Sequence, residues 1–120
     1  MHNDATTTLQ MLKERADKFA TDRDWVKFHN PKDMTMAMVR EATELMELML
    51  WKTPEQIAAQ LAQDPAYKER LREELGDVVH ALARLSSLLE FDIAQAFYDK
   101  MAKTENKYPV DQVHGRLVKR

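Results

Sequence analysis

“VREATELMELMLW”, residues 39–51, has the periodicity of an apolar helix but carries regularly spaced acids. Glu41, Glu44 and Glu47 recur every three residues, and the only basic residue of the stretch is Arg40. On a helical wheel Glu41 falls inside the apolar sector, Glu44 at its edge and Glu47 nearer to solvent. Because burying an unpaired carboxylate is unfavourable, we expect Glu41 to need a cation, a set of hydrogen-bond donors or a proton.

A second helical stretch repeats this placement of acids. In “REELGDVVHALARL”, residues 72–85, Glu74 and Asp77 lie three residues apart at the border of an apolar stripe. If the two stripes pack together, four carboxylates converge and repel one another unless a positive charge lies between them. Ligands that are all oxygen suit Mg²⁺, with Mn²⁺ as the alternative, and substrate phosphates commonly complete such sites.

The competing interpretation is a solvated acidic face, which is the commoner meaning of acids at helical spacing. In that case Arg70 would pair with Glu74 across one turn, and Arg84 would pair with Asp77. The position of both acid pairs beside apolar residues favours the metal site.

The composition is typical of a helical protein with one domain. Of its 120 residues 44% are hydrophobic and 32% charged, with only 2 Gly and 4 Pro. A net charge of −2 creates no basic field, so a nucleic acid polymer is not an expected partner. Cysteine is absent, which excludes thiolate chemistry. We expect a soluble, cytoplasmic protein with no signal peptide, no membrane span and no membrane partner.

Hydrophobic periodicity predicts an all-α bundle of four to five helices without strands. Asp33 is the expected cap of the second helix, and the chain after Asn106 is expected to be an extended tail. Residues 1–111 would form the domain and residues 112–120 the C-terminal tail. Because apolar residues surround the second helix almost completely, we expect a homo-oligomer. The helices are predicted at about residues 6–24, 34–51, 55–63, 66–89 and 92–106.

Five short motifs together resemble one family of enzymes. The acid pairs “EATE” and “EELGD” follow the Glu-x-x-Glu and Glu-x-x-Asp pattern of the MazG-like all-α nucleoside triphosphate pyrophosphohydrolases. The remaining motifs resemble the dCTP pyrophosphatase branch of that family, and the resemblance extends over residues 16–111. These motifs are “RDWVKFHNPKD” at 23–33, “MLW” at 49–51 and “KMAKTENKYPV” at 100–110.

The resemblance implies a MazG-like helical bundle that hydrolyses a nucleoside triphosphate to the monophosphate and pyrophosphate. Mg²⁺ would be held by Glu41, Glu44, Glu74 and Asp77 and would activate a water for attack on phosphorus. Glu41 and Glu44 are therefore catalytic candidates. Glu47 either orients or deprotonates that water or is simply an exposed helix position. The expected substrate is dCTP or a modified dCTP, the role nucleotide pool sanitation, and the assembly a dimer or a dimer of dimers.

Further residues are predicted to bind the nucleotide. The tryptophans correspond to base-pocket aromatics, which are good stacking surfaces. His29 matches a histidine of the family, with a loop-fixing hydrogen bond as its expected role. The lysines are candidates for phosphate clamps. The predicted set is Trp25, His29, Trp51, Lys100, Lys103, Thr104, Lys107 and Tyr108.

Three positions depart from the pattern of the dCTP enzymes. Ala16 replaces a histidine, Ala81 a tyrosine and Thr104 an asparagine. Loss of a hydrogen bond to a base can change discrimination by orders of magnitude, so a preference for dCTP should not simply be carried over. His80 and Asn106 are candidate substitutes, and the vacated space suits a bulkier, modified base.

Two other classes of function remain open. Asp77 and His80 form an acid-x-x-His motif, but a di-metal helical oxidoreductase needs Glu-x-x-His on two helices, and the predicted helices contain one acid-x-x-His motif. The second class is a non-catalytic helical module that senses nucleotides or binds a partner, because an acid tetrad beside an altered base pocket can bind without turnover.

Overall fold

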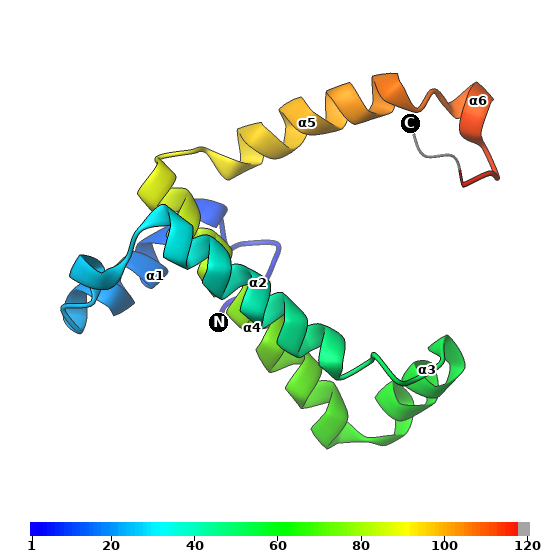
Figure 1. Cartoon of the computed structure of the whole chain (residues 1–120), viewed down its shortest axis with the longest axis horizontal. Helices are drawn as coiled ribbons and strands as arrows, with labels where there is room; N and C mark the ends of the chain where they lie inside the picture. Colours follow the sequence, from blue (N-terminus) through cyan, green and yellow to red (C-terminus); the bar gives the residue numbers. More distant parts are fainter. Residues whose placement is uncertain (118–120) are drawn as a thin grey trace. The chain divides into compact units, whose positions relative to one another are not determined.

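A computed structural model describes residues 1–117, and this part of the chain is helical without strands (Figure 1). The predicted all-α fold is thereby confirmed. The chain divides into two units, the first Met1–Glu90 and the second from Phe91 onwards, and each is described by itself. In order, the elements are α1 (Leu9–Asp22), the 3₁₀ turn η1 (Val26–Phe28), α2 (Pro31–Glu47), α3 (Pro54–Gln63), α4 (Pro65–Leu89), α5 (Ile93–Lys107) and α6 (Val110–Val113).

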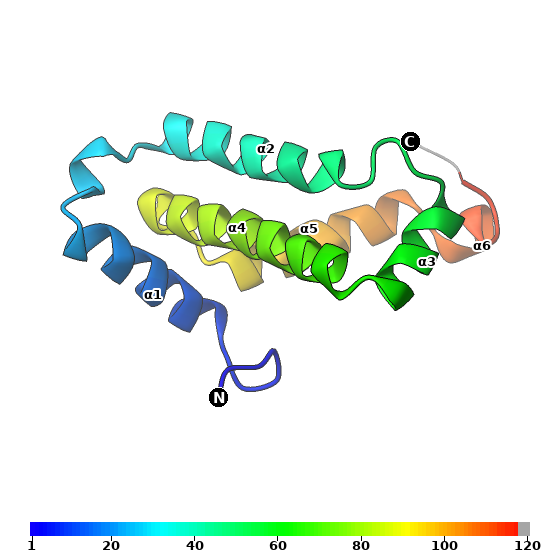
Figure 2. The same cartoon turned by 90° about the horizontal axis from the view of Figure 1, so that it is seen from below.

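The first unit is organised around α4. Helices α1, α2 and α3 each pack against it, and both views show α2 running alongside α4 (Figures 1 and 2). The Tyr67 hydroxyl donates a hydrogen bond of 2.7 Å to the carbonyl of Leu48, which joins the start of α4 to the end of α2. Most of the buried residues lie on α4: Tyr67, Leu71, Ala81, Ala83, Arg84, Leu85 and Ser86.

The start of α2 differs from the prediction. Asn30 has extended backbone and caps the helix, and Pro31 occupies its first turn, where a missing N–H is not needed. The backbone N–H of Asp33 donates to Asn30 Oδ1 at 2.9 Å. Asp33 therefore lies inside the helix, and its prediction as the cap was wrong.

The end of α2 also differs, because the helix ends at Glu47 rather than at Trp51. The N–H groups of Leu48 and Met49 bond to carbonyls three residues earlier, which is the tighter pattern that commonly closes a helix. Thr53 has extended backbone because Pro54 follows it, and Thr53 caps α3. The turn before Thr53 leaves Trp51 90% exposed.

Asp64 separates α3 from α4, as predicted. Its backbone N–H donates to Gln60, while its carboxylate accepts from the N–H groups of Ala66 and Tyr67. The hydrogen bonds from the Tyr67 N–H and then from the Gln60 side chain lower the pKa of Asp64. One residue thus ends one helix and caps the next.

The second unit contains α5, capped by Asp92, and the short helix α6. The predicted extended tail was wrong for residues 110–113, because their backbone closes a helical turn in which the His114 N–H bonds to the Val110 carbonyl at 2.9 Å. The last three residues of that tail lie outside the described residues. The division between residues 111 and 112 stays a prediction.

No helix within residues 1–117 combines the length and the apolar character needed to cross a membrane.

Candidate metal centre

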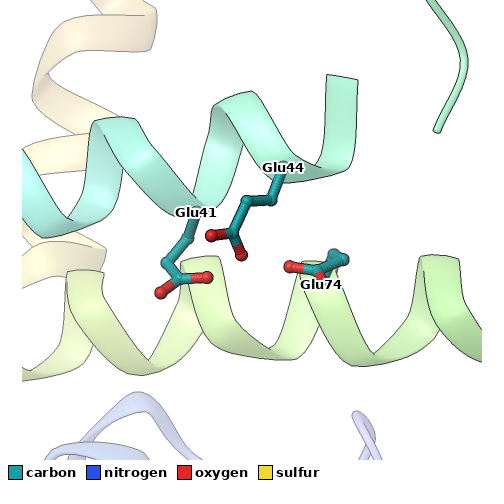
Figure 3. Close-up of side chains that lie close together, drawn as sticks. All are labelled: Glu41, Glu44 and Glu74. Atoms are coloured by element: carbon teal, nitrogen blue, oxygen red, sulfur yellow. The ribbon is translucent and has the colours of Figure 1, made fainter. Parts of the chain in front are cut away.

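Three carboxylates converge between α2 and α4 (Figure 3). Glu41 and Glu44 are three residues apart and therefore share one face of α2, and the packing of α2 on α4 brings Glu74 opposite them. One oxygen of each carboxylate lies within 4.8 Å of the other two, and all three residues are half-buried. This convergence was predicted from the sequence for these three acids.

Glu41 is the acid most affected by the cluster. Burial raises its pKa, and a hydrogen bond with Glu44 and the negative charges of Glu44 and Asp77 raise it further. Arg40 acts in the opposite direction, since its Nη2 atom lies 3.5 Å from Glu41 Oε1. The Arg40 side chain is 68% exposed and that of Glu41 18%, so solvent screens this pair and the cluster keeps an excess of negative charge.

Glu74 carries an unsatisfied buried atom. Its Oε2 is inaccessible to solvent and has no hydrogen-bond partner within residues 1–117. Such atoms are rare in folded proteins because each forfeits the hydrogen bonds it makes in water. Under the alternative interpretation Arg70 would neutralise Glu74, but Glu74 Oε2 has no partner within residues 1–117. The donor set, all oxygen and negatively charged, fits Mg²⁺ or Mn²⁺.

Asp77, the fourth predicted ligand, does not join the convergent carboxylates. It lies one turn after Glu74 and is exposed, and it is not among the three acids that converge. Its charge nevertheless raises the pKa of Glu41. The alternative pairing of Asp77 with Arg84 was wrong, because Arg84 Nη1 instead donates to Asp17 Oδ1 at 3.0 Å. Asp77 as a ligand stays a prediction.

Three more predicted residues lie in the first unit. Glu47 is exposed at the last position of α2 and does not belong to the convergent set. The ring of Trp25 meets that of Phe19 edge to face at 5.7 Å and is partly exposed, whereas Trp51 is almost fully exposed. A catalytic role for Glu47 and base-binding roles for the tryptophans stay predictions.

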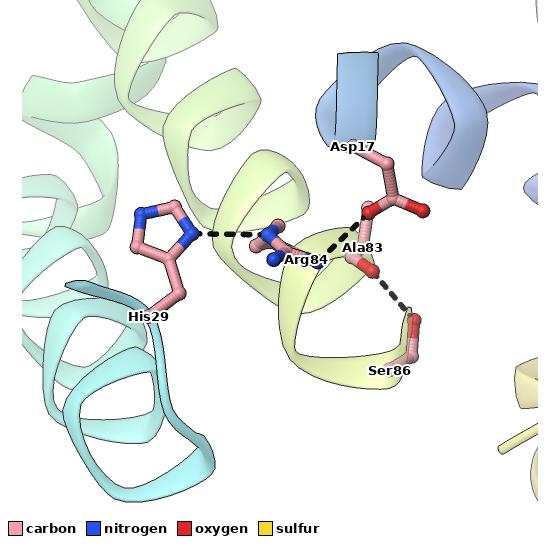
Figure 4. A network of polar contacts seen from close by, with 5 residues as sticks. All are labelled: Asp17, His29, Ala83, Arg84 and Ser86. Carbon is pink, nitrogen blue, oxygen red and sulfur yellow. Dashed lines mark hydrogen bonds and ion pairs between the residues drawn. The ribbon is translucent and has the colours of Figure 1, made fainter. Parts of the chain in front are cut away.

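His29 makes the loop-fixing hydrogen bond that its position led us to expect. Arg84 Nε donates to His29 Nδ1 at 3.0 Å (Figure 4). Burial lowers the pKa of His29, and the charges of Arg84 and His80 lower it further. The sequence did not predict Arg84 as the partner of His29, nor Asp17 as the second partner of Arg84. The available signal was an arginine within the apolar run “HALARLSSLL”, because such an arginine needs a partner if it is buried.

A groove of about 860 Å³ runs between α1 and α4, and the sequence did not predict it. Two of the departures from the family pattern, Ala16 and Ala81, are buried, and Ala16 lines this groove. His80, a predicted substitute base contact, lines it too and meets the Phe19 ring edge to face at 5.4 Å. Its apolar walls are Leu12, Ala16, Phe19, Leu75, Val79 and Ala83.

The remaining predicted residues lie in the second unit, on α5 and at its C-cap. Their spacing puts most of them on one face of α5, where the Thr104 carbonyl accepts a bond of 2.9 Å from the Tyr108 N–H. Lys107 Nζ lies 5.6 Å from the Tyr108 ring centroid. Roles in substrate binding stay predictions for Lys100, Lys103, Thr104, Lys107 and Tyr108.

Known proteins share both the sequence pattern and the fold. The sequence profile of the MazG-like family matches residues 37–119, a range that contains both acid pairs. The chain is 36% identical over 112 residues to dCTP pyrophosphatase 1 of Bos taurus and to that of Mus musculus. Each match covers 93% of this chain and 66% or 65% of the relative, so the chain spans about two thirds of their length.

A solved structure is similar as well. A pyrophosphatase from Archaeoglobus fulgidus superposes with a TM-score of 0.77 at 28% identity. The match covers 91% of this chain and 98% of that one. The helical arrangement around the acid cluster is thus a known fold.

Proposed function

The chain belongs to the MazG-like family, and from this premise we propose that it is a Mg²⁺-dependent nucleoside triphosphate pyrophosphohydrolase. The convergence of Glu41, Glu44 and Glu74, with the unpartnered buried oxygen of Glu74, carries the proposal. The relatives named dCTP pyrophosphatase 1 and the solved pyrophosphatase support the class of reaction. The substrate we propose is dCTP or a modified dCTP, and the role is sanitation of the nucleotide pool.

The residues that would hold Mg²⁺, or Mn²⁺ in its place, are Glu41, Glu44 and Glu74, with Asp77 as the proposed fourth ligand. When bound, the ion supplies neutralisation of phosphate charge and Lewis-acid activation at the reacting phosphorus. Glu41 acts as a ligand in its deprotonated form, and its raised pKa opposes deprotonation. Metal affinity is therefore expected to rise with pH above the ordinary range of a glutamate.

Other residues would act on the nucleotide and the water. Trp25 and Trp51 offer aromatic faces for the base. Glu47 would orient the attacking water or take its proton as the bond to pyrophosphate breaks. Clamping of the phosphate chain falls to Lys100, Lys103 and Lys107, with His29, Thr104 and Tyr108 as further substrate-binding residues.

The two alanines bear on the choice of base. Ala16 and Ala81 replace a histidine and a tyrosine of the dCTP enzymes, which removes side-chain volume and hydrogen-bonding groups. We expect a dCTP carrying a substituent at position 5 to be turned over with a higher kcat/KM than dCTP. Equal values, or a preference for dCTP, would refute this choice of substrate.

The proposed assembly is a homo-oligomer, a dimer or a dimer of dimers, located in the cytoplasm. Its basis is the apolar surface of the chain around α2, where Met36 is 60%, Val39 58%, Met46 50% and Leu50 49% exposed. Light scattering across a dilution series tests the assembly. A fully active monomer would refute it.

The experiment that tests the function measures pyrophosphate release from canonical and modified triphosphates with Mg²⁺. We expect release by the wild type and its loss in Glu41→Gln. Glu55→Gln is the matched control, since Glu55 is an exposed acid in the first turn of α3 and lies outside the cluster. If the wild type releases no pyrophosphate but triphosphates raise its Tm, the chain is a nucleotide-sensing module instead.

A further inference from the structure

Arg84 is a buried charged residue near the C-terminal end of α4, away from the acid cluster. Its side chain is 7% exposed, and a guanidinium removed from water is stable only with partners. Arg84 Nη1 donates to Asp17 Oδ1, and Arg84 Nε donates to His29 Nδ1, each at 3.0 Å (Figure 4). We call Asp17, His29 and Arg84 the clasp.

The clasp joins three segments that are far apart in the sequence. Asp17 lies on α1, His29 follows η1, and Arg84 lies near the end of α4. The connection between α1 and α2, residues 23–30, is called the aromatic segment. His29, the C-cap of η1, lies in this segment, so its hydrogen bond to Arg84 ties the segment to α4. One guanidinium thus fixes this segment to two helices at once.

The aromatic segment has little apolar packing to hold it in place. Trp25 is 46%, Val26 45% and Phe28 65% exposed. Segments with few buried apolar contacts open locally at low free-energy cost, so a hydrogen bond to a buried partner contributes much of their order. Within this segment His29 supplies such a bond, and its partner is Arg84.

The hydrogen bonds of the clasp require an arginine at position 84 and a neutral acceptor at position 29. Arginine presents Nε and Nη donors in a rigid fork, whereas the single ammonium of lysine cannot occupy both positions. His29 accepts at Nδ1 and must therefore be neutral, which agrees with its lowered pKa. Facing the imidazole are Arg84 and His80 from α4, and the anion of the clasp is Asp17 from α1.

The clasp and the metal centre share one helix. Asp77 and Arg84 are seven residues apart on α4, which puts them on the same face roughly 10 Å apart along the axis. The ring of His80, between them in sequence, meets Phe19, and Phe19 meets Trp25. The aromatic segment is therefore held against α4 about two turns beyond Asp77.

We propose that Arg84 is a positioning residue of the hydrolase: through His29 it holds the aromatic segment, and with it the Trp25 side chain, in the place where the nucleotide base stacks. This inference rests on the proposed function. In this role Arg84 acts through His29 and not by contact with substrate or metal. Its loss acts on substrate binding and leaves the acid cluster unchanged.

Four variants separate positioning from folding. His29→Leu removes the acceptor, whereas His29→Asn retains an acceptor oxygen close to the position of Nδ1. Arg84→Lys keeps the charge but loses the fork. Arg72→Lys is the matched control, because Arg72 lies on the same helix with a side chain that is 69% exposed. Each variant is made in the full-length chain.

The first measurement is KM against kcat for pyrophosphate release. In His29→Leu and Arg84→Lys we expect KM to rise roughly tenfold, as for the loss of one hydrogen bond to a charged group. We expect kcat to stay within about threefold, because the acid cluster is intact. His29→Asn should recover most of the loss, and Arg72→Lys should show none. Equal KM values in His29→Leu and His29→Asn would overturn the inference.

The second measurement does not depend on turnover. In a Trp51→Phe background Trp25 is the remaining one of the 2 tryptophans, so its fluorescence reports on the aromatic segment. We expect acrylamide to quench Trp25 more strongly in His29→Leu than in His29→Asn. Equal quenching overturns the inference even if the enzyme is active. Absence of pyrophosphate release from the wild type, in contrast, refutes the proposed function itself.

Discussion

Helix α4 carries partly buried charge in two places, the clasp and the acid cluster, and the two differ in how far the charge is neutralised by partners within the chain. In the clasp, the Arg84 guanidinium has an anionic and a neutral acceptor, both at 3.0 Å. In the acid cluster, three carboxylates face one another, the exposed Arg40 lies 3.5 Å from Glu41, and Glu74 Oε2 has no partner among residues 1–117.

The presence or absence of partners within the chain distinguishes a charge with a structural role from charges that can bind a ligand. A charge satisfied by the chain itself holds segments together, whereas a cluster left unsatisfied stores repulsion that an external cation relieves. The clasp is therefore expected to contribute stability at all times. At neutral pH the acid cluster should contribute it only when a metal ion is bound.

The largest effect is expected from removing one acid of the cluster. Glu44→Gln should lower pyrophosphate release by about a hundredfold or more, because one metal ligand is lost. The same change removes a like charge, so the free energy of unfolding of the metal-free protein should stay the same or rise. A variant that is inactive because it is unfolded, as judged by circular dichroism, would break the comparison.

Adding Mg²⁺ should have the next largest effect. At a hundredfold excess over its Kd the ion stabilises the folded protein by about 2.7 kcal/mol, which thermal unfolding detects as a higher Tm that EDTA reverses. Glu74→Gln should abolish most of this shift, whereas Asp17→Ala should retain it. An equal shift in both variants would mean that the ion binds elsewhere.

Breaking the ion pair of the clasp should have a smaller effect on stability, which is measured in the metal-free protein. Asp17→Ala should lower the free energy of unfolding by about 1–2 kcal/mol, less than for a fully buried pair because its side chain is 41% exposed. Glu69→Ala is the control: Glu69 pairs with Arg72 on the surface of α4 and should lose at most about 0.5 kcal/mol. Urea unfolding measures both. Equal losses would show that the clasp is no stronger than a surface pair.

The smallest effects are expected from pH, and they should have opposite signs in the two regions. The pKa of Glu41 is raised on folding, so its contribution to stability is present below the ordinary value of 4.5 and is lost as the pH rises through the higher, folded-state pKa. The pKa of His29 is lowered, so its contribution is present above 6.5 and is lost as the pH falls towards the folded-state pKa.

Two variants test which residue causes each change of stability with pH. In the metal-free protein, Glu41→Gln should remove the loss of stability on the alkaline side of 4.5, and His29→Asn the loss on the acidic side of 6.5. Urea unfolding at a series of pH values measures both slopes. If either variant changes the slope assigned to the other, the two regions are coupled and the comparison fails.

Much of the fold could be predicted because local rules decide it. Thr8, Thr53 and Asp92 are caps whose side chains accept from backbone N–H groups, and Pro54 occupies the first turn of α3, where proline is favoured. Errors occurred where two local rules compete. At the start of α2 both Asn30 and Asp33 are good caps, and the proline between them selects Asn30.

The predicted apolar stripe of α4 shows a limit of periodicity. Leu71 and Leu85 are buried, but Leu75 is 54% and Leu89 39% exposed. Periodicity places such residues on one side of a helix, but the neighbours that cover that side come from other parts of the chain. The groove between α1 and α4, which Leu75 lines, was missed for the same reason.

The sequence by itself determined the helices and the two acid pairs, because the spacing of side chains along a helix follows from its geometry. Only the tertiary structure decided which charges find partners. Arg84 binds His29 and Asp17, 55 and 67 residues away, rather than Asp77. Such pairs depend on how helices pack, and the packing of α2 on α4 brings three carboxylates together and leaves Glu74 Oε2 without a partner among residues 1–117.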